Sequence, residues 1–219
     1  MTTTFGRYVG KISSRFDPSE LMGQLSSVPQ WLDAGQVLPL SDGRDQVLKT
    51  DLVIGGQAVG VAIKVFGRQS FFKDWFDHRN ESKAARSYNA GEFLYQKELG
   101  TAEPIAWLDR WDGGRLVESY YLCVHVAAPC FRDALIHVYE EEHNNAGMMD
   151  LLYKVAPALR KLHEAGFMHG DLGNQNILLP KSPAGEWLAP LFIDLNRSQY
   201  PSAPLGNRER AHDLARIAL

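Results

Sequence analysis

The chain has 219 residues, of which 45% are hydrophobic, and a formal net charge of −3. This length and composition allow a substantial core to form, and the small negative charge argues against nucleic acid or a membrane surface as the main partner. The 2 cysteines lack the spacing of a metal-binding pair and suit a reducing compartment, and no apolar run approaches the ~18 residues of a spanning helix. We therefore expect a cytoplasmic protein.

Residues 1–34 are expected to form an N-terminal extension, because their apolar pattern is weak and Pro18 and Pro29 interrupt it. Trp31 and Leu32 are expected to dock this extension on the body of the protein. Strands then follow in three segments, near residues 37–40, 46–54 and 58–66.

The polar turn between the first two strands is the nearest candidate for a phosphate-binding loop. It contains Ser41 and a single glycine, Gly43, in place of a glycine-rich loop. Backbone amides and the Ser41 hydroxyl could contact an ATP phosphate there. A plain hairpin explains the same residues equally well.

Lys64 lies in an otherwise apolar strand, Val-Ala-Ile-Lys-Val-Phe, which is the pattern of the strand that carries the ATP-contacting lysine of kinases. A buried ammonium group needs an anionic partner, and ATP phosphates together with a helix glutamate would provide one. We select Glu92, from the helix expected over residues 84–99, in preference to Glu81 and Glu98. A lysine that reaches solvent from an edge strand is the alternative interpretation.

Residues 67–80, between that strand and that helix, mix aromatic and basic side chains. We expect a short amphipathic helix there, and a contact for a lipid or sugar-phosphate acceptor is the functional alternative. After the helix, residues 105–126 are expected to form a hairpin with a turn at residues 112–114.

The second half of the chain is expected to be mainly helical. A first helix is predicted over residues 131–142, and a longer second helix ends at Gly166. The second helix has apolar residues at intervals of three and four, which predicts a buried face made of Met148, Leu151, Leu152, Val155, Leu159 and Leu162.

The segment that follows, His169 to Leu179 (HGDLGNQNILL), has the spacing of a kinase catalytic loop. Asp171 supplies a carboxylate that can orient an acceptor hydroxyl and take its proton. Asn176, five residues later, supplies an amide oxygen for a magnesium ion on the ATP phosphates. Asp194 follows an apolar run at the place where a second acidic residue is expected, and two strands joined by a turn would bring it beside Asn176. An aspartate that only caps a turn is the alternative for Asp194.

Two further residues are predicted to support this loop. His169 is interpreted as a scaffold that is hydrogen-bonded to backbone, in preference to a proton-transfer group. Asp213, in a last helix expected over residues 209–219, is predicted to accept hydrogen bonds from loop backbone near His169, and a solvated Asp213 is the alternative. The other histidines have no ligand spacing, so no zinc site is expected.

The H-G-D-L-x-x-x-N-I-L loop, the I-D-L-N strand end and the E-F-L-Y-x-x-x-L-G-x-x-x-P helix exit resemble the lipopolysaccharide core kinase family. This family includes the Kdo and heptose kinases of Gram-negative bacteria. The resemblance covers residues 37–219 and implies an α+β, bilobal protein-kinase-like fold, with an antiparallel-sheet N-lobe and a mainly helical, reduced C-lobe. The corresponding division is an extension over residues 1–34, an N-lobe over 35–128 and a C-lobe over 129–219.

The same resemblance implies a phosphotransferase that uses ATP and Mg²⁺ and acts on a sugar hydroxyl of the lipopolysaccharide core. Asp171 would be the catalytic base, Asn176 and Asp194 the Mg²⁺ ligands, and Lys64, paired with Glu92, the ligand of the ATP phosphates. The expected location is the cytoplasm, with peripheral contact with the inner membrane as an option, and nucleic acid is not an expected partner.

Two residues depart from ordinary protein kinases. Gly173 stands where Ser/Thr protein kinases usually carry lysine, and Asn196 stands where a glycine or aspartate usually completes the second metal motif. There are therefore two alternatives to a lipopolysaccharide core kinase. One is a small-molecule or protein kinase of the same fold, and the other is a nucleotide-binding pseudokinase.

Overall fold

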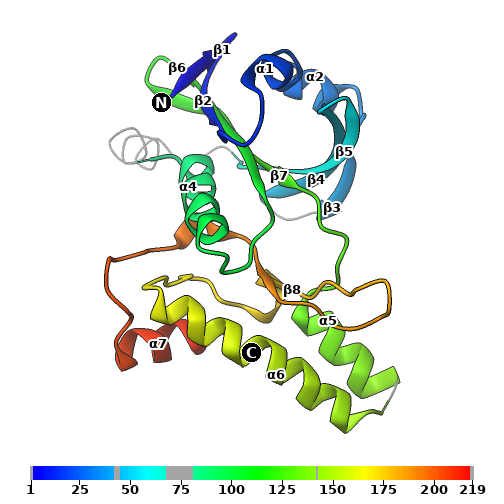
Figure 1. The fold of residues 1–219 in the computed structure, drawn as a ribbon. Helices are drawn as coiled ribbons and strands as arrows, with labels where there is room; N and C mark the ends of the chain where they lie inside the picture. Colours follow the sequence, from blue (N-terminus) through cyan, green and yellow to red (C-terminus); the bar gives the residue numbers. More distant parts are fainter. Residues whose placement is uncertain (1, 42–44, 68–80, 142, 218–219) are drawn as a thin grey trace. The chain divides into compact units, whose positions relative to one another are not determined.

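The computed structural model describes residues 2–41, 45–67, 81–141 and 143–217 (Figure 1). The chain divides into two compact units. The first comprises Met1–Glu92 and Glu103–His125, and the second comprises Phe93–Ala102 and Val126–Leu219. The expected boundary after residue 128 thus falls after residue 125, and residues 93–102 group with the second unit.

The described part of the first unit contains a seven-stranded antiparallel sheet, in the order β1-β2-β6-β7-β5-β4-β3. Its strands are β1 Thr3–Phe5, β2 Tyr8–Ile12, β3 Leu38–Ser41, β4 Gln46–Ile54, β5 Gln57–Val65, β6 Pro104–Asp112 and β7 Arg115–Val124. The three predicted strands coincide with β3, β4 and β5 to within one residue, and the predicted hairpin coincides with β6 and β7 to within two residues.

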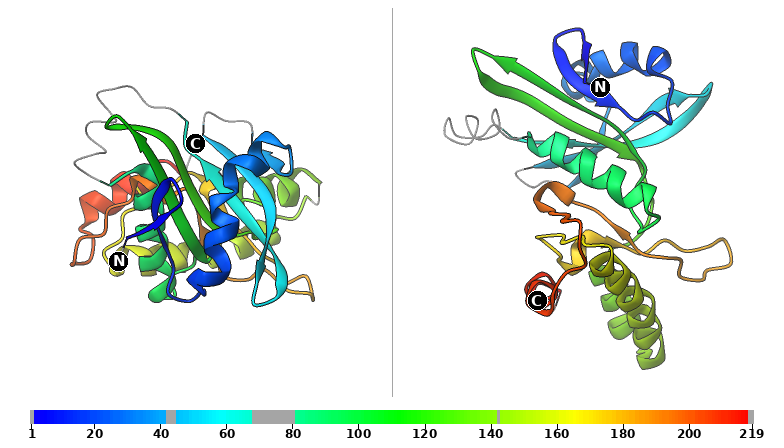
Figure 2. Two further views of the ribbon diagram at one scale, coloured as in Figure 1. Left: turned by 90° about the horizontal axis from the view of Figure 1, so that it is seen from above. Right: turned by 60° about the vertical axis from the view of Figure 1, so that its left-hand side comes forward.

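The N-terminal segment differs most from its expectation as a weakly patterned extension. β1 and β2 extend the sheet beside β6, and two helices follow, α1 (Pro18–Ser26) and α2 (Val28–Asp33) (Figure 2). Asp17 caps α1 by accepting a hydrogen bond from Ser19 N, and Pro18 occupies the first turn, where its missing N–H costs nothing. Pro18 therefore begins a helix, although the sequence suggested an interruption.

The core of the first unit depends on this segment. The buried cluster combines its apolar side chains with those of the sheet: Phe5, Tyr8, Leu21, Leu25 and Val28 with Leu52, Val61, Ile63, Ile105 and Leu108. Trp31 and Leu32 are partly buried against the same cluster, which agrees with the expected docking. Full burial of one such side chain is worth about 1.5–3 kcal/mol, so the segment is an integral part of the unit.

Two elements of the first unit position predicted site residues. In β5, Val61 and Ile63 are fully buried, and the alternation of the strand places Lys64 on the opposite face. Helix α4 (Lys83–Gln96) carries Glu92, and its residues Ala84 and Tyr88 pack in a small cluster with Phe66 and Tyr121.

The described part of the second unit is mainly helical. Its helices are α5 (Phe131–Ile136), which continues as the π-helical η1 (His137–Glu141), then α6 (Asn145–Glu164) and α7 (Asn207–Leu214). Short 3₁₀ turns η2 (Asn174–Asn176) and η3 (Leu195–Arg197) flank a two-stranded sheet of β8 (Ile177–Leu178) and β9 (Leu191–Phe192). In the described residues, no helix is both long enough and apolar enough to span a bilayer.

Helix α6 delivers the chain to the predicted loop. Leu151, Val155, Leu159 and Leu162 are buried along one face, as expected, but Leu152 is 43% exposed. The prediction for Leu152 was wrong because it lies about 100° around the helix from Leu151. Gly166 ends the segment with φ of +76°, a left-handed conformation that favours glycine.

Candidate active site

His169 is fully buried and fixes the start of the predicted catalytic loop. Its Nε2 lies 2.9 Å from the carbonyl oxygen of Ile193, and its Nδ1 accepts a hydrogen bond of 3.3 Å from the backbone N–H of Asp171. These two contacts require a neutral ring with its proton on Nε2. Burial also lowers the pKa of His169, which favours the same neutral form. The ring therefore holds backbone on both sides, as a scaffold would.

Asp213 holds the same loop from α7. Its Oδ2 accepts from His169 N at 3.0 Å and its Oδ1 accepts from Gly170 N at 2.8 Å, which are contacts of the kind that the sequence analysis placed there. His163 Nε2, from α6, lies 3.0 Å from Oδ2. Burial alone would raise the pKa of Asp213, but the hydrogen bonds from His163 and from the two backbone amides lower it overall. Asp213 therefore joins α6, α7 and the loop as an ionised, buried carboxylate.

We expect Asp213→Asn to lower the free energy of unfolding by about 3–5 kcal/mol, because breaking a buried, hydrogen-bonded charge site leaves donors unpaired. The melting temperature should fall by about 10 °C. Since the pKa of Asp213 is depressed in the folded state, its stabilising effect is present above the unfolded pKa and disappears as the pH falls through the folded pKa.

Chemical denaturation between neutral and acid pH measures both effects. Asp133→Asn is the matched control, because the Asp133 side chain is 56% exposed and forms an ion pair with its neighbour Arg132 on α5. Equal effects of the two substitutions would show that Asp213 does not support the loop.

Asp171 lies on the loop between two arginines. Arg197 Nη1, at the end of η3, is 3.1 Å from its Oδ2, and Arg216 Nη1, in the turn after α7, contacts its Oδ1. The Asp171 side chain is 26% exposed, and the arginine side chains are about half exposed. Asp171 was predicted from the loop motif, whereas neither arginine was, because both lie outside that motif.

Asn176 and Asp194 are brought together by the small β8–β9 sheet. Ile177 pairs with Phe192, and Ile193 N donates to the backbone oxygen of Asn176 at 3.0 Å, so Asp194 is the next residue along. The Asn176 amide nitrogen donates to the backbone oxygen of Asp171 at 2.8 Å, which fixes the orientation of the amide. The backbone therefore brings Asp171, Asn176 and Asp194 close together in the second unit.

Asp194 has an uncommon backbone conformation, with φ of 62° and ψ of 51°. Aspartate tolerates this left-handed region better than most residues, and such conformations cluster at functional sites. Its Oδ1 accepts from the amide nitrogen of Asn196 at 2.8 Å, so Asn196 helps to orient the carboxylate. Asn196 is thus a neighbour of the proposed metal ligand, a role that the sequence comparison with protein kinases did not suggest.

The donor set of Asn176 and Asp194 fits Mg²⁺. Mg²⁺ prefers oxygen ligands and typically uses one or two carboxylates with waters and substrate phosphates. Within the described residues, no group of three or more histidine, cysteine, aspartate or glutamate side chains is arranged to hold a metal ion.

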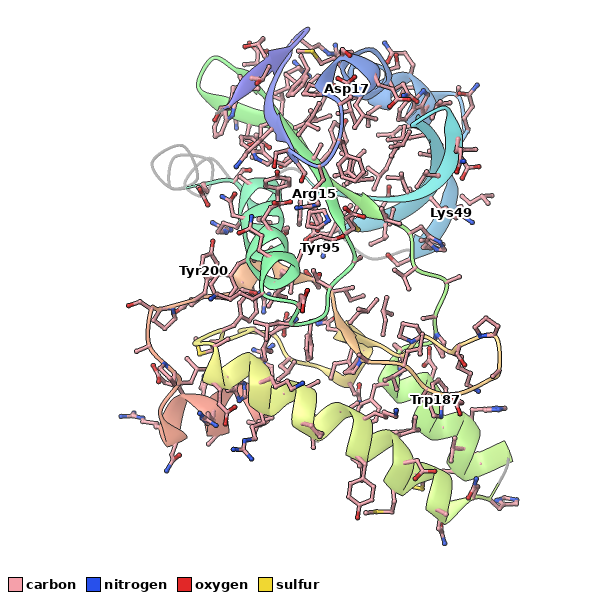
Figure 3. The ribbon with its side chains drawn as sticks, viewed as in Figure 1. Arg15, Asp17, Lys49, Tyr95, Trp187 and Tyr200 are labelled. Atoms are coloured by element: carbon pink, nitrogen blue, oxygen red, sulfur yellow. The ribbon has the colours of Figure 1, made fainter. Side chains whose placement is uncertain are left out.

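In the first unit, Glu92 has a partner that the sequence analysis missed. Arg15, which is labelled in Figure 3, lies in the turn before α1 and donates to both carboxylate oxygens of Glu92, at 2.6 and 3.1 Å. Arg15 also donates to Glu103 at 2.9 Å and to the backbone oxygen of Pro104 at 3.0 Å. A planar guanidinium in this fork geometry fixes the carboxylate strongly. No sequence signal marks Arg15, because it lies in the segment with little pattern.

Arg15 is expected to position Glu92 for its predicted pairing with Lys64. Arg15→Ala should lower kcat/KM for ATP by about tenfold to a hundredfold, the scale of a misplaced catalytic group. Arg15→Lys should restore only part of it, because an ammonium group cannot form the fork. Arg110→Ala is the matched control, since Arg110 pairs with Glu118 in the same unit and its side chain is also 25% exposed. If both alanine variants change ATP kinetics equally, Arg15 has no positioning role.

The predicted phosphate-binding turn is only partly described. Ser41, at the end of β3, is exposed, and its hydroxyl accepts a hydrogen bond of 3.2 Å from Val47 N, a contact that a plain hairpin also makes. Gly43 and residues 68–80 lie outside the described residues. Lys64 and Glu92 belong to the first unit and the loop residues to the second.

Comparison with known proteins gives a family and a fold. The model of the lipopolysaccharide kinase (Kdo/WaaP) family matches residues 69–219. A solved structure described as WaaP in complex with acyl carrier protein matches with a TM-score of 0.62 and 19% sequence identity, over 95% of this chain and 79% of that chain. This likeness shows a shared mixed α/β fold with an antiparallel sheet. No curated protein matches the chain.

Proposed function

Because this chain belongs to the lipopolysaccharide kinase (Kdo/WaaP) family, we propose that it transfers the γ-phosphoryl group of ATP to a sugar hydroxyl of the lipopolysaccharide core. The family membership makes the protein a kinase. ATP with Mg²⁺ as cofactors and a core sugar as acceptor are the finer parts of the proposal, together with a bilobal protein-kinase-like fold.

The observation that carries the proposal is the grouping of Asp171, Asn176 and Asp194 in the second unit. Phosphoryl transfer requires mainly positioning and neutralisation of charge. Asp171 would orient the acceptor hydroxyl and receive its proton. Asn176 and Asp194 would hold Mg²⁺, and a bound Mg²⁺ would neutralise negative charge on the ATP phosphates. Both residues are fixed through backbone and amide hydrogen bonds, which supports a preorganised site.

Lys64, paired with Glu92, would bind the ATP phosphates from the first unit. Lys64 projects from the face of β5 opposite to the buried residues Val61 and Ile63. From that face its ammonium group can bind phosphates without being buried in the core. Ser41 and Gly43 would contribute from the turn after β3. Gly173, in place of lysine, favours a sugar acceptor over a protein serine or threonine, and we place the reaction in the cytoplasm, with peripheral contact with the inner membrane.

Three experiments test this function. Purified protein should consume ATP only when Mg²⁺ is present, and nucleotide with Mg²⁺ should raise its melting temperature. Mass spectrometry of core oligosaccharide from a strain that lacks the gene should show the loss of one phosphate. An unchanged core, together with absence of nucleotide binding, would contradict the proposal, and nucleotide binding without turnover would favour a pseudokinase.

A further inference from the structure

A cavity lies in the first unit where helices α1 and α2 meet strands β3 and β4. Its volume is about 670 Å³, within the range of about 300–1,000 Å³ that is usual for small-molecule sites. Trp31 lines the cavity and is also partly buried against the core. Most of the other lining residues are polar, among them Gln24, Ser27, Gln36 and Asp51. In the described part of the chain, the lining includes no residue that is proposed above for phosphoryl transfer.

The backbone of Asp51 points away from β5, toward the outer edge of the sheet. In an antiparallel strand, the N–H and C=O of one residue point to the same side, and that side alternates from residue to residue. Two residues along β4, Val53 N donates to the Gln24 side chain at 2.9 Å and Val53 O accepts from it at 2.8 Å. Gly60, the partner of Asp51 in β5, uses its carbonyl oxygen for His125 N at 2.8 Å, after β7. Asp51 therefore presents one N–H and one C=O outward, at the cavity that it lines.

The neighbours of Asp51 along this edge leave its peptide group open. β3 begins at Leu38, opposite Lys49, so it does not extend to the position of Asp51. On the other side, the Gln24 amide is bonded to Val53. The gap in the sheet edge is therefore one outward residue long. An added peptide strand would pair over several residues, so a gap of this length favours a smaller ligand with one N–H donor and one C=O acceptor.

We propose that this cavity binds a sugar that carries an acetamido group. The acetamido N–H and C=O would pair with the C=O and N–H of Asp51, as a neighbouring strand does elsewhere in the sheet. The indole of Trp31 offers an apolar surface for the sugar ring. Ser27 and Gln36 offer a hydroxyl and an amide for the hydroxyl groups of the sugar. The inference goes beyond the proposed function, because it assigns the first unit a sugar-binding site that takes no part in phosphoryl transfer.

Matched ligands test this site in the full chain without nucleotide, so the result does not depend on whether the protein turns over ATP. Methyl N-acetylglucosaminide should bind about tenfold more tightly than methyl glucoside, which keeps the ring and lacks the acetamido group. In isotope-labelled protein, the backbone amide resonance of Asp51 and the indole resonance of Trp31 should shift with the acetylated sugar. N-acetylglycine methylamide has amide groups but no sugar ring. If it binds as tightly as the acetylated sugar, the site recognises peptide and the inference is wrong.

A substitution that fills the cavity then assigns the binding to it. Gly23 lines the cavity, and a Cβ atom on it would meet no neighbouring side chain or strand within 4 Å. Gly23→Leu should therefore keep the wild-type melting temperature and weaken binding of the acetylated sugar at least about tenfold. Gln30→Leu is the control, because Gln30 is exposed on α2 and does not line the cavity. The inference is overturned if wild-type protein binds both glycosides equally, or if Gly23→Leu binds the acetylated sugar as tightly as Gln30→Leu does.

Discussion

Asp171→Asn is expected to lower the rate of phosphotransfer by about 10²–10⁴-fold, the usual contribution of a positioned general base. The asparagine side chain keeps the size of aspartate but cannot take the proton of an acceptor hydroxyl. The contacts that build the loop use the backbone of Asp171, whose N–H donates to His169 and whose carbonyl accepts from Asn176. Folding and Mg²⁺-ATP binding should therefore stay close to wild type.

The measurement is single-turnover transfer from ATP, with the melting temperature and Mg²⁺-ATP affinity of the same variant as controls. A variant that keeps more than about a third of the wild-type rate would exclude Asp171 as the base.

The loop could be predicted because its signal is local. Asp171 and Asn176 are five residues apart, and Asp194 follows the next apolar run, so spacing alone predicted that they meet. The structure forms the β8–β9 pairing on which that prediction depends. The structure shows that these residues lie near one another in the second unit. Their roles in catalysis and metal binding stay proposals.

The N-terminal segment could not be predicted for the opposite reason. β1 has three residues and β2 has five, too few to show an alternating pattern, and β2 pairs with β6 about a hundred positions later. Tertiary packing of Phe5 and Tyr8 decides the structure there. Arg15 was missed with this segment, since its ion pair with Glu92 joins residues that are far apart in sequence.

Arg197 and Arg216 show a different limit of sequence reading. Both lie close to residues that the sequence analysis selected, Asp194 and Asp213, yet an arginine in a polar turn is usually solvated. Only the fold brings them to the two oxygens of one carboxylate. The ion pairs of Asp171 therefore could not be inferred from the motif that identified this residue.

Asp194→Asn is expected to weaken Mg²⁺-dependent ATP binding by at least about a hundredfold, because loss of an outer-shell partner alone weakens metal sites by about 10–100-fold. Asparagine suits the left-handed backbone at this position and can still accept the hydrogen bond from Asn196. The substitution thus removes the charge and leaves the conformation, whereas alanine would also add backbone strain.

Nucleotide titrations with Mg²⁺ and with EDTA separate this effect from a general loss of the site. Asp194→Asn should leave metal-free ATP affinity unchanged, whereas Lys64→Ala should weaken ATP binding in both conditions, since Lys64 is proposed to meet the phosphates directly. Asp150→Asn, an exposed carboxylate on α6, controls for the change in net charge. If Asp194→Asn binds Mg²⁺-ATP as tightly as this control does, Asp194 is not a metal ligand. If Lys64→Ala also binds and turns over normally, the nucleotide site lies elsewhere in the protein.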